Sequence, residues 1–193
     1  MTGFESAART TTAHLDALGL PFALVGGFAV SVWCEPRFTR DIDLAVAVSS
    51  DEVAEGAVLT LAREGYEVLA VVEQEAGRLA TVRLAVGPDR DLVDLLFASS
   101  GIEPEIADAA RRVQVLPGLV LPVATVGHLI ALKLLAADSR TRPQDQVDLQ
   151  ALVAVSDPAD VAVAEEAVAM IEARGDQRGR DLVGALAALV SSR

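Results

Sequence analysis

The alternation of apolar and polar residues divides the chain into a first part with strands and helices and a second part with helices alone. Strands are expected where short apolar runs are bounded by turn residues, at 22–26, 42–48, 67–73, 79–86 and 91–97. Helices are expected at 4–19, 28–34, 51–63 and 105–112. The segment 113–123 predicts a small hairpin that turns at Pro117 and Gly118.

After this hairpin the pattern becomes helical throughout. Apolar positions recur at helical spacing over residues 125–138, 143–154, 158–173 and 180–191. We therefore expect an α/β (α+β) protein, with a small mixed β-sheet core flanked by helices over residues 1–123. A C-terminal helical bundle is expected over residues 124–193. No linker-like stretch separates the two parts, so we expect them to pack together.

The composition fits a folded protein from a reducing compartment. Apolar residues make up 52% of the 193 residues, which suffices for a sizeable core. The single cysteine, Cys34, cannot form an intrachain disulfide. The N-terminus lacks the pattern of a signal peptide, and no uninterrupted apolar stretch reaches the roughly 18 residues of a membrane helix. We expect a cytoplasmic protein without a membrane segment.

The net charge of −12 argues against broad electrostatic binding to nucleic acid, which needs a basic surface. A local basic groove remains compatible with this charge. An anionic substrate would need metal ions and a few well-placed cations.

The first candidate site is the Gly26–Gly27 pair, where an expected strand ends and an expected helix begins. Glycine permits a tight turn and lets a ligand approach the main chain. The N–H groups at a helix N-terminus attract anions, and neither position carries a side chain that can cap the helix. A phosphate could supply the missing acceptor, although a lone Gly-Gly pair is more often a simple turn.

The second candidate site is Asp41-Ile42-Asp43, at the start of an expected strand. Residues i and i+2 of a strand point to the same face with their Cα atoms about 6.5–7 Å apart. Both carboxylates can therefore converge on one or two divalent ions, with Mg²⁺ favoured by the oxygen ligands. Ile42 is expected in the core. Alone, this pattern also fits a solvated surface, and its combination with the glycine turn favours a functional site.

Further polar residues accompany these two motifs. Arg37, Thr39 and Arg40 lie between them, and a guanidinium can contact triphosphate oxygens with two hydrogen bonds. For Arg40 alone, a solvated loop position is an equal alternative. Asp94 lies inside the apolar run 92–97, where burial of a charged side chain costs free energy unless the charge is paired or functional. It could complete a metal site or act as a general base, whereas Asp91 is expected to face solvent.

Together, Gly26-Gly27, Arg37-x-Thr39-x-Asp41-x-Asp43 and Asp94 resemble the first two motifs of the polymerase-β-like nucleotidyltransferase superfamily. The version with Arg-x-Thr-x-Asp-x-Asp resembles the AbiEii/AbiGii toxin-like nucleotidyltransferases. A second block, LIALKLLAADSRTRPQDQVDL, is similar to a helical motif of that family, through Lys133, Ala136, Arg140, Asp145, Asp148 and Leu149. Gln144 departs from the family pattern, which often has arginine there. The resemblance covers residues 22–152.

The second block also has a physical reading of its own. Lys133 is the only lysine of the chain and lies in a nearly continuous apolar helix, where a buried ammonium costs several kcal/mol unless it is paired. Lys133 and Arg140 are seven residues apart, so they share a helix face that could present two cations to a triphosphate. Alternatively, Lys133 reaches solvent or pairs with an aspartate. We expect Asp145 and Asp148 to contact the side chains that bind the nucleotide and not the nucleotide itself.

The resemblance implies a Mg²⁺-dependent enzyme that transfers NMP from an NTP to an acceptor hydroxyl and releases pyrophosphate. Asp41 and Asp43 would hold two metal ions with Asp94, while Gly26, Gly27, Arg37, Thr39, Arg40, Lys133 and Arg140 would contact the nucleotide. AbiEii-like toxins imply an RNA acceptor such as a tRNA 3′ end, and an antitoxin as partner. A small-molecule transferase of the aminoglycoside or lincosamide kind is the alternative enzyme. A non-catalytic nucleotide-binding or antitoxin-like module is the third possibility.

Overall fold

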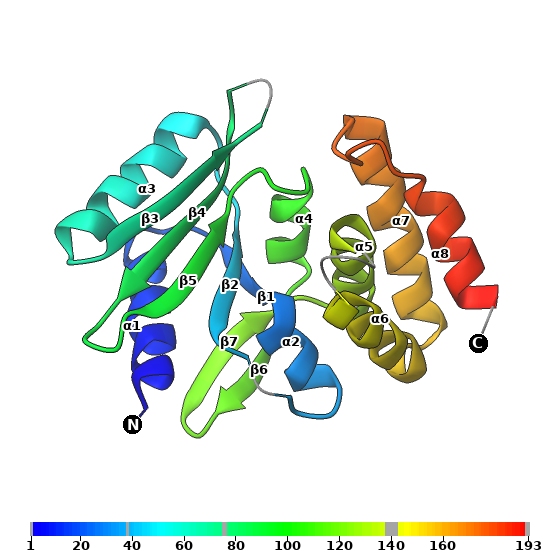
Figure 1. Cartoon of the computed structure of the whole chain (residues 1–193), viewed down its shortest axis with the longest axis horizontal. Helices are drawn as coiled ribbons and strands as arrows, with labels where there is room; N and C mark the ends of the chain where they lie inside the picture. The colour runs from blue at the N-terminus through cyan, green and yellow to red at the C-terminus, as the bar shows by residue number, and fades with distance from the viewer. Residues whose placement is uncertain (1, 38, 75–76, 138–142, 192–193) are drawn as a thin grey trace.

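The computed structural model describes residues 2–37, 39–74, 77–137 and 143–191 (Figure 1). Its strands are β1 (Phe22–Val25), β2 (Asp41–Val46), β3 (Glu67–Glu73), β4 (Leu79–Val86), β5 (Asp91–Leu96), β6 (Arg111–Leu116) and β7 (Leu119–Val123). Its helices are α1 (Gly3–Ala17), α2 (Gly26–Trp33), α3 (Asp51–Arg63), α4 (Glu103–Asp108), α5 (Val126–Ala136), α6 (Pro143–Val155), α7 (Pro158–Arg174) and α8 (Leu182–Ser191). The expected mixed α/β fold is confirmed.

Several element boundaries differ from the sequence-based expectation, and two of the differences concern α2 and α4. Helix α2 already begins at Gly26 instead of residue 28. The helix expected over 105–112 was wrong at its C-terminal end, because α4 stops at Asp108 and Arg111 begins β6. The strand forms there because residues 111–116 pair antiparallel with β7, a contact that lies beyond the reach of local helical periodicity.

The seven strands form one mixed sheet in the order β3-β4-β5-β2-β1-β7-β6. Strand β2 is parallel to β5 and β1 is parallel to β7, whereas the other neighbouring pairs are antiparallel. The helices α5 to α8 form a bundle beside the sheet (Figure 1). Helix α2, which follows β1, contacts both α5 and α6 of this bundle.

One hydrophobic core joins the sheet to the helical bundle. Ile42 and Leu95 of the sheet and Leu129 and Ile130 of α5 belong to the same buried cluster, each with at most 1% of its surface exposed. Burial of one such side chain contributes about 1.5–3 kcal/mol. At the junction of the two parts, the Trp33 indole donates a hydrogen bond of 2.8 Å to the Ala124 carbonyl oxygen.

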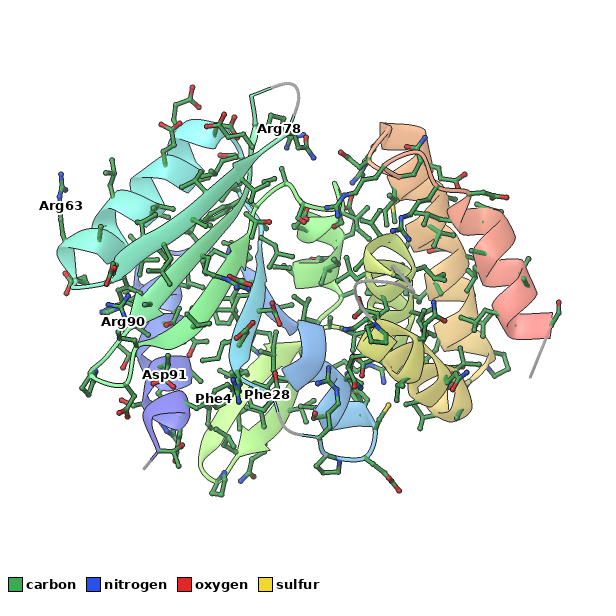
Figure 2. The ribbon with its side chains drawn as sticks, in the orientation of Figure 1. Phe4, Phe28, Arg63, Arg78, Arg90 and Asp91 are labelled. Atoms are coloured by element: carbon green, nitrogen blue, oxygen red, sulfur yellow. The ribbon has the colours of Figure 1, made fainter. Side chains whose placement is uncertain are left out.

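Helix α2, which begins at the candidate glycine turn, is fixed from behind by an aromatic contact. Phe28 of α2 packs edge-on against Phe4 of α1, with ring centroids 5.1 Å apart (Figure 2). Such pairs contribute about 0.5–1.5 kcal/mol beyond their buried area. The contact connects the N-terminal end of α2 to α1. In the part of the chain that the structure describes, no helix combines the length and apolar character needed to cross a membrane.

Candidate active site

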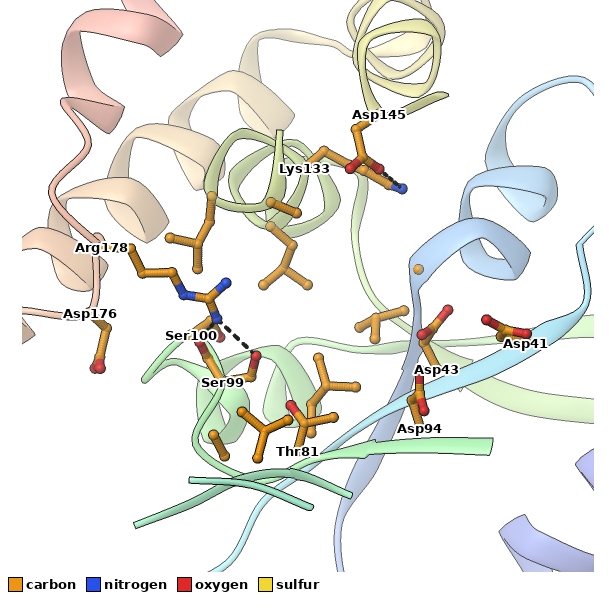
Figure 3. Close-up of a pocket in the computed structure, with 18 of the residues that line it drawn as sticks. Asp41, Asp43, Thr81, Asp94, Ser99, Ser100, Lys133, Asp145, Asp176 and Arg178 are labelled. Atoms are coloured by element: carbon orange, nitrogen blue, oxygen red, sulfur yellow. Dashed lines mark hydrogen bonds and ion pairs between the residues drawn. The ribbon is translucent and has the colours of Figure 1, made fainter. Parts of the chain in front are cut away.

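Three carboxylates form a row across the two central strands. Asp41 and Asp43 share one face of β2, while the side chain of Ile42 between them is fully buried. Asp43 lies opposite Asp94 of the parallel strand β5, so all three acids project from the same face of the sheet (Figure 3). The strand register thus brings Asp94 to the two aspartates of β2, as the sequence analysis expected of a neighbouring strand.

An arginine that the sequence analysis did not single out completes this row. Arg83 of β4 lies opposite Asp94 in the antiparallel β4–β5 pair. Its Nε and Nη2 donate hydrogen bonds of 2.8 and 2.6 Å to the two carboxylate oxygens of Asp94, and Nη2 also lies 3.4 Å from Asp41 Oδ2. The sequence did offer one sign of Arg83: it is a charged residue within the otherwise mostly apolar strand LATVRLAV.

The two neighbouring carboxylates leave Asp43 in an unfavourable electrostatic environment. Burial, and then the charges of Asp94 and Asp41, raise the pKa of Asp43 to about 7, against the opposing effect of Lys133 and Arg83. The ionised form of this row therefore has a deficit of positive charge. A cation that entered the site would relieve this repulsion.

The residues of this row fit a divalent ion in their chemistry. Carboxylate oxygens are the ligands that Mg²⁺ prefers, and Asp41 and Asp43 offer them from one strand face. Within the described ranges, however, no group of three or more His, Cys, Asp or Glu side chains is arranged as a ready metal site. Asp94 is turned toward Arg83. The β2 pair is thus the part that fits a metal as it stands.

The glycine at the start of α2 is required by its contact with Asp43. Gly26 has a φ of +65°, and a methyl group at its Cα would overlap the Asp43 carboxylate. The N-cap residue of α2, Val25, makes no side-chain capping hydrogen bond. The start of this helix therefore combines uncapped N–H groups with a close approach to the acid row, which suits the phosphate of a metal-bound nucleotide.

We expect Gly26→Ala to destabilise the protein by at least about 2 kcal/mol, because it adds a carboxylate overlap to the strain of a left-handed backbone. Gly87→Ala is the matched control, since Gly87 has a φ of +75° but no atom within 4 Å of the added methyl group. Urea denaturation of both variants measures the difference. Equal losses of unfolding free energy would show that the contact with Asp43 is unimportant.

Arg37 reaches from the loop before β2 to the helical bundle. Its Nε and Nη2 donate hydrogen bonds of 2.9 and 2.8 Å to the two carboxylate oxygens of Asp148 in α6. Gly27 makes room for this guanidinium, because a methyl group there would lie 2.5 Å from Arg37 Nη2. Both Arg37 and Gly27 line the cleft beside the acid row, together with Thr39 and Arg40.

Lys133 of α5 adopts the pairing that the sequence analysis gave as an alternative. Its Nζ lies 2.7 Å from Asp145 Oδ1 and 2.7 Å from Asp148 Oδ2, and only 12% of the side chain is exposed. The second carboxylate oxygen of Asp145 is buried without a hydrogen-bond partner among the described residues. Arg140, the expected companion of Lys133, lies outside the described residues.

Asp148 is the centre of this network. Burial alone would raise its pKa, but hydrogen bonds from Arg37, Lys133 and Gln144 outweigh that effect and hold the pKa of Asp148 below its ordinary value. Gln144, at the position where the resemblance would place an arginine, donates its amide hydrogen to Asp148 Oδ1 over 3.1 Å. The network joins the sheet core to two helices of the bundle.

A cleft of about 1680 Å³ lies between the sheet, which carries the acid row, and the helical bundle, which carries Lys133. One end holds the acid row and Lys133, and the other is lined by Thr81, Ser99 and the α7–α8 loop around Arg178 (Figure 3). Sites for drug-sized ligands usually occupy about 300–1,000 Å³. The cleft therefore has room for two substrates side by side.

The comparison with known families agrees with this arrangement. The family model "Nucleotidyl transferase AbiEii toxin, Type IV TA system" matches residues 12–191, nearly the whole chain. The chain belongs to the AbiEii nucleotidyltransferase family. The resemblance to AbiEii/AbiGii toxin-like nucleotidyltransferases is thereby confirmed, and the AbiEii-family chain is a nucleotidyltransferase, an enzyme class that uses NTP substrates.

Solved structures show the same fold as this AbiEii-family chain. The lincosamide antibiotic adenylyltransferase LnuA, in its lincomycin-bound crystal structure, matches with a TM-score of 0.52 and 14% identity, over 79% of this chain and 98% of that one. The antibiotic-resistance factor ANT(2″)-Ia, in a solution structure, matches with a TM-score of 0.50 and 19% identity, over 97% of this chain and 91% of that one. No curated protein matches the chain.

Proposed function

We propose that the protein transfers NMP from an NTP to an acceptor hydroxyl, with Mg²⁺ held by Asp41 and Asp43. The observation that carries this proposal is the in-register row of Asp41, Asp43 and Asp94 beside the uncapped start of α2. When bound, Mg²⁺ would neutralise phosphate charge and polarise the α-phosphate. The carboxylates of β2 would hold it against the sheet.

The bonds that change follow from this placement. The acceptor oxygen forms a bond to the α-phosphorus, and the bond from that phosphorus to the bridging oxygen breaks. Pyrophosphate leaves with the electron pair of the broken bond. Asp94, held beside the β2 pair, takes the proton of the acceptor hydroxyl as the general base.

The cations of the bundle wall are proposed to bind the triphosphate. Lys133 and Arg37 both line the cleft near the acid row, and both are held by Asp148. A triphosphate oxygen can pair with such a cation while the carboxylate keeps the side chain in position. Asp145 and Asp148 would thus orient the cations, and Thr39 and Arg40 would line the phosphate side.

For the acceptor, we infer an RNA 3′ end such as that of a tRNA, with the protein acting as the toxin of a toxin–antitoxin pair. The matched family is described as a type IV toxin. Arg174 and Arg178 bring two guanidinium groups to the end of the cleft opposite the acid row, where an RNA phosphate can pair with them. Glu73 and Asp176 line the same end of the cleft, so the phosphate contacts would rest on these two guanidinium groups and not on a basic surface.

A small-molecule acceptor is the second candidate. The net charge of −12 favours a small or cationic acceptor over a large polyanion. The shared fold with LnuA, solved with lincomycin bound, is compatible with such a substrate. In this case the body of a drug-like molecule would occupy the end of the cleft beside Ser99, with its reacting hydroxyl directed toward Asp94.

The test is incubation of the protein with each labelled NTP, Mg²⁺ and total cellular RNA, with a panel of aminoglycosides and lincosamides in parallel. Label on RNA 3′ ends is the expected result, and label on a drug supports the second candidate. Asp41→Asn protein serves as the control and should transfer nothing. Full transfer by that variant, or none by the wild type with any acceptor, would contradict the proposal. Growth arrest on expression, absent with Asp41→Asn, tests the toxin role.

A further inference from the structure

Arg83 faces the acid row but has no part in the transfer proposed above. Its guanidinium contacts both carboxylate oxygens of Asp94 and one of Asp41. We propose that Arg83 is a built-in counter-cation that competes with the divalent ion for Asp94 and Asp41. Entry of the metal would then release the guanidinium. This inference rests on the metal role proposed for Asp41 and Asp43.

The ion pair between Arg83 and Asp94 occupies the carboxylate oxygens for which a metal ion would compete. Two parallel hydrogen bonds of 2.8 and 2.6 Å engage both carboxylate oxygens of Asp94, the only atoms through which this side chain could bind a metal. Asp94 therefore cannot turn to an ion beside Asp43 while this pairing persists. This explains why the described acids form no ready three-ligand site.

The negative charges of the acid row explain why a counter-cation such as Arg83 is needed. Three carboxylates from adjacent positions repel one another when no cation is near, and Asp43 lies beside both Asp41 and Asp94. Lys133 also bears on this charge from the opposite side of the cleft, but among the described residues it is bonded to two aspartates of α6 and makes no ion pair with the row, whereas Arg83 contacts the row directly. Arg83 supplies a positive charge to the row before the metal arrives. Once a divalent ion is bound, the same charge becomes an unfavourable like-charge neighbour.

Release of Arg83 is sterically feasible. Its side chain is 41% exposed, whereas that of Asp94 is 11% exposed. Because the arginine stands at the cleft wall on β4, rotation of its side chain can take the guanidinium into the cleft without moving the sheet. Asp94 can then face the β2 pair.

The test measures Mn²⁺ binding to the full-length, metal-free protein by electron paramagnetic resonance, as a substitute for Mg²⁺. Arg83→Gln is expected to bind Mn²⁺ about tenfold tighter than the wild type, equivalent to about 1.4 kcal/mol. Without metal its melting temperature should fall below that of the wild type, and Mn²⁺ should restore it. Arg90→Gln is the control, because Arg90 also forms an ion pair, with Glu67, but lies away from the acid row (Figure 2).

Unchanged or weaker Mn²⁺ binding by Arg83→Gln would overturn the inference. If Arg83→Gln does not fold, Arg83→Lys replaces it, since lysine keeps the charge but cannot form the paired hydrogen bonds. It should bind Mn²⁺ about threefold tighter, and an unchanged affinity would again overturn the inference. Wild-type protein that binds no Mn²⁺, with no difference from Asp43→Asn, would instead count against the proposed metal role itself.

Discussion

Replacement of Asp43 by asparagine is expected to abolish nucleotidyl transfer and to stabilise the metal-free protein. Activity should fall by about 10³-fold or more, because an amide is a poor ligand for the ion that stabilises phosphoryl charge. The free energy of unfolding without metal should rise by about 1–3 kcal/mol, because a half-buried carboxylate beside Asp41 and Asp94 is replaced by a neutral group. A purely structural aspartate would show the opposite change in stability.

The matched control for this experiment is Asp91→Asn. Asp91 begins the same strand as Asp94, but it is three residues away, on the opposite face, and lies near Phe4 in the figure (Figure 2). Transfer of label from NTP and urea denaturation in EDTA are measured for both variants. Asp91→Asn should keep its activity. If Asp43→Asn also keeps it, the acid row is not the catalytic centre.

The second large effect is expected from Asp148→Asn, which should lower the free energy of unfolding by about 3 kcal/mol. The Asp148 side chain is 1% exposed and bonds to both Arg37 and Lys133, so the variant leaves two partly buried cations without their shared counter-charge. Because the network joins the sheet core to the bundle, NTP binding should weaken as well. Denaturation and nucleotide titration measure the two effects.

Glu105→Gln is the control for that variant. Glu105 forms a comparable ion pair with Arg174, but its side chain is 33% exposed and that of Arg174 is 41% exposed. Pairs of this kind contribute about 0–1 kcal/mol. The comparison of the two variants therefore separates the effect of burial on stability from the effect of ion pairing itself. A loss for Asp148→Asn as small as that for Glu105→Gln would mean that the network contributes little to holding the two parts together.

The sheet and most helices could be predicted because each is encoded by a local apolar pattern. The helix at Asp51–Arg63 has its cap residue, Ser50, and its bounds written in adjacent residues, and it was predicted at those bounds. The strand that begins at Arg111 was partly missed, because only pairing with β7 makes its first residues extended. Short elements at such junctions depend on contacts that local periodicity does not contain.

The residues of the candidate site also divide into those that local sequence predicts and those that depend on contacts between distant parts of the chain. Asp41, Asp43 and Asp94 could be proposed from strand alternation and from a charge inside an apolar run. Arg83 could not, because its meaning depends on the register of β4 against β5, which a single sequence leaves open. The partner of Arg37 was equally hidden, since Asp148 lies 111 positions further along the chain.

The hydrogen bond from Trp33 to Ala124 gives the protein an internal optical probe. Trp33 is the only tryptophan of the chain, and its indole sits where the end of α2 meets the connection between β7 and α5. Indole emission responds to the loss of such a hydrogen bond. Any movement of the bundle relative to the sheet on nucleotide binding is therefore expected to change the fluorescence of the native protein, without an added label.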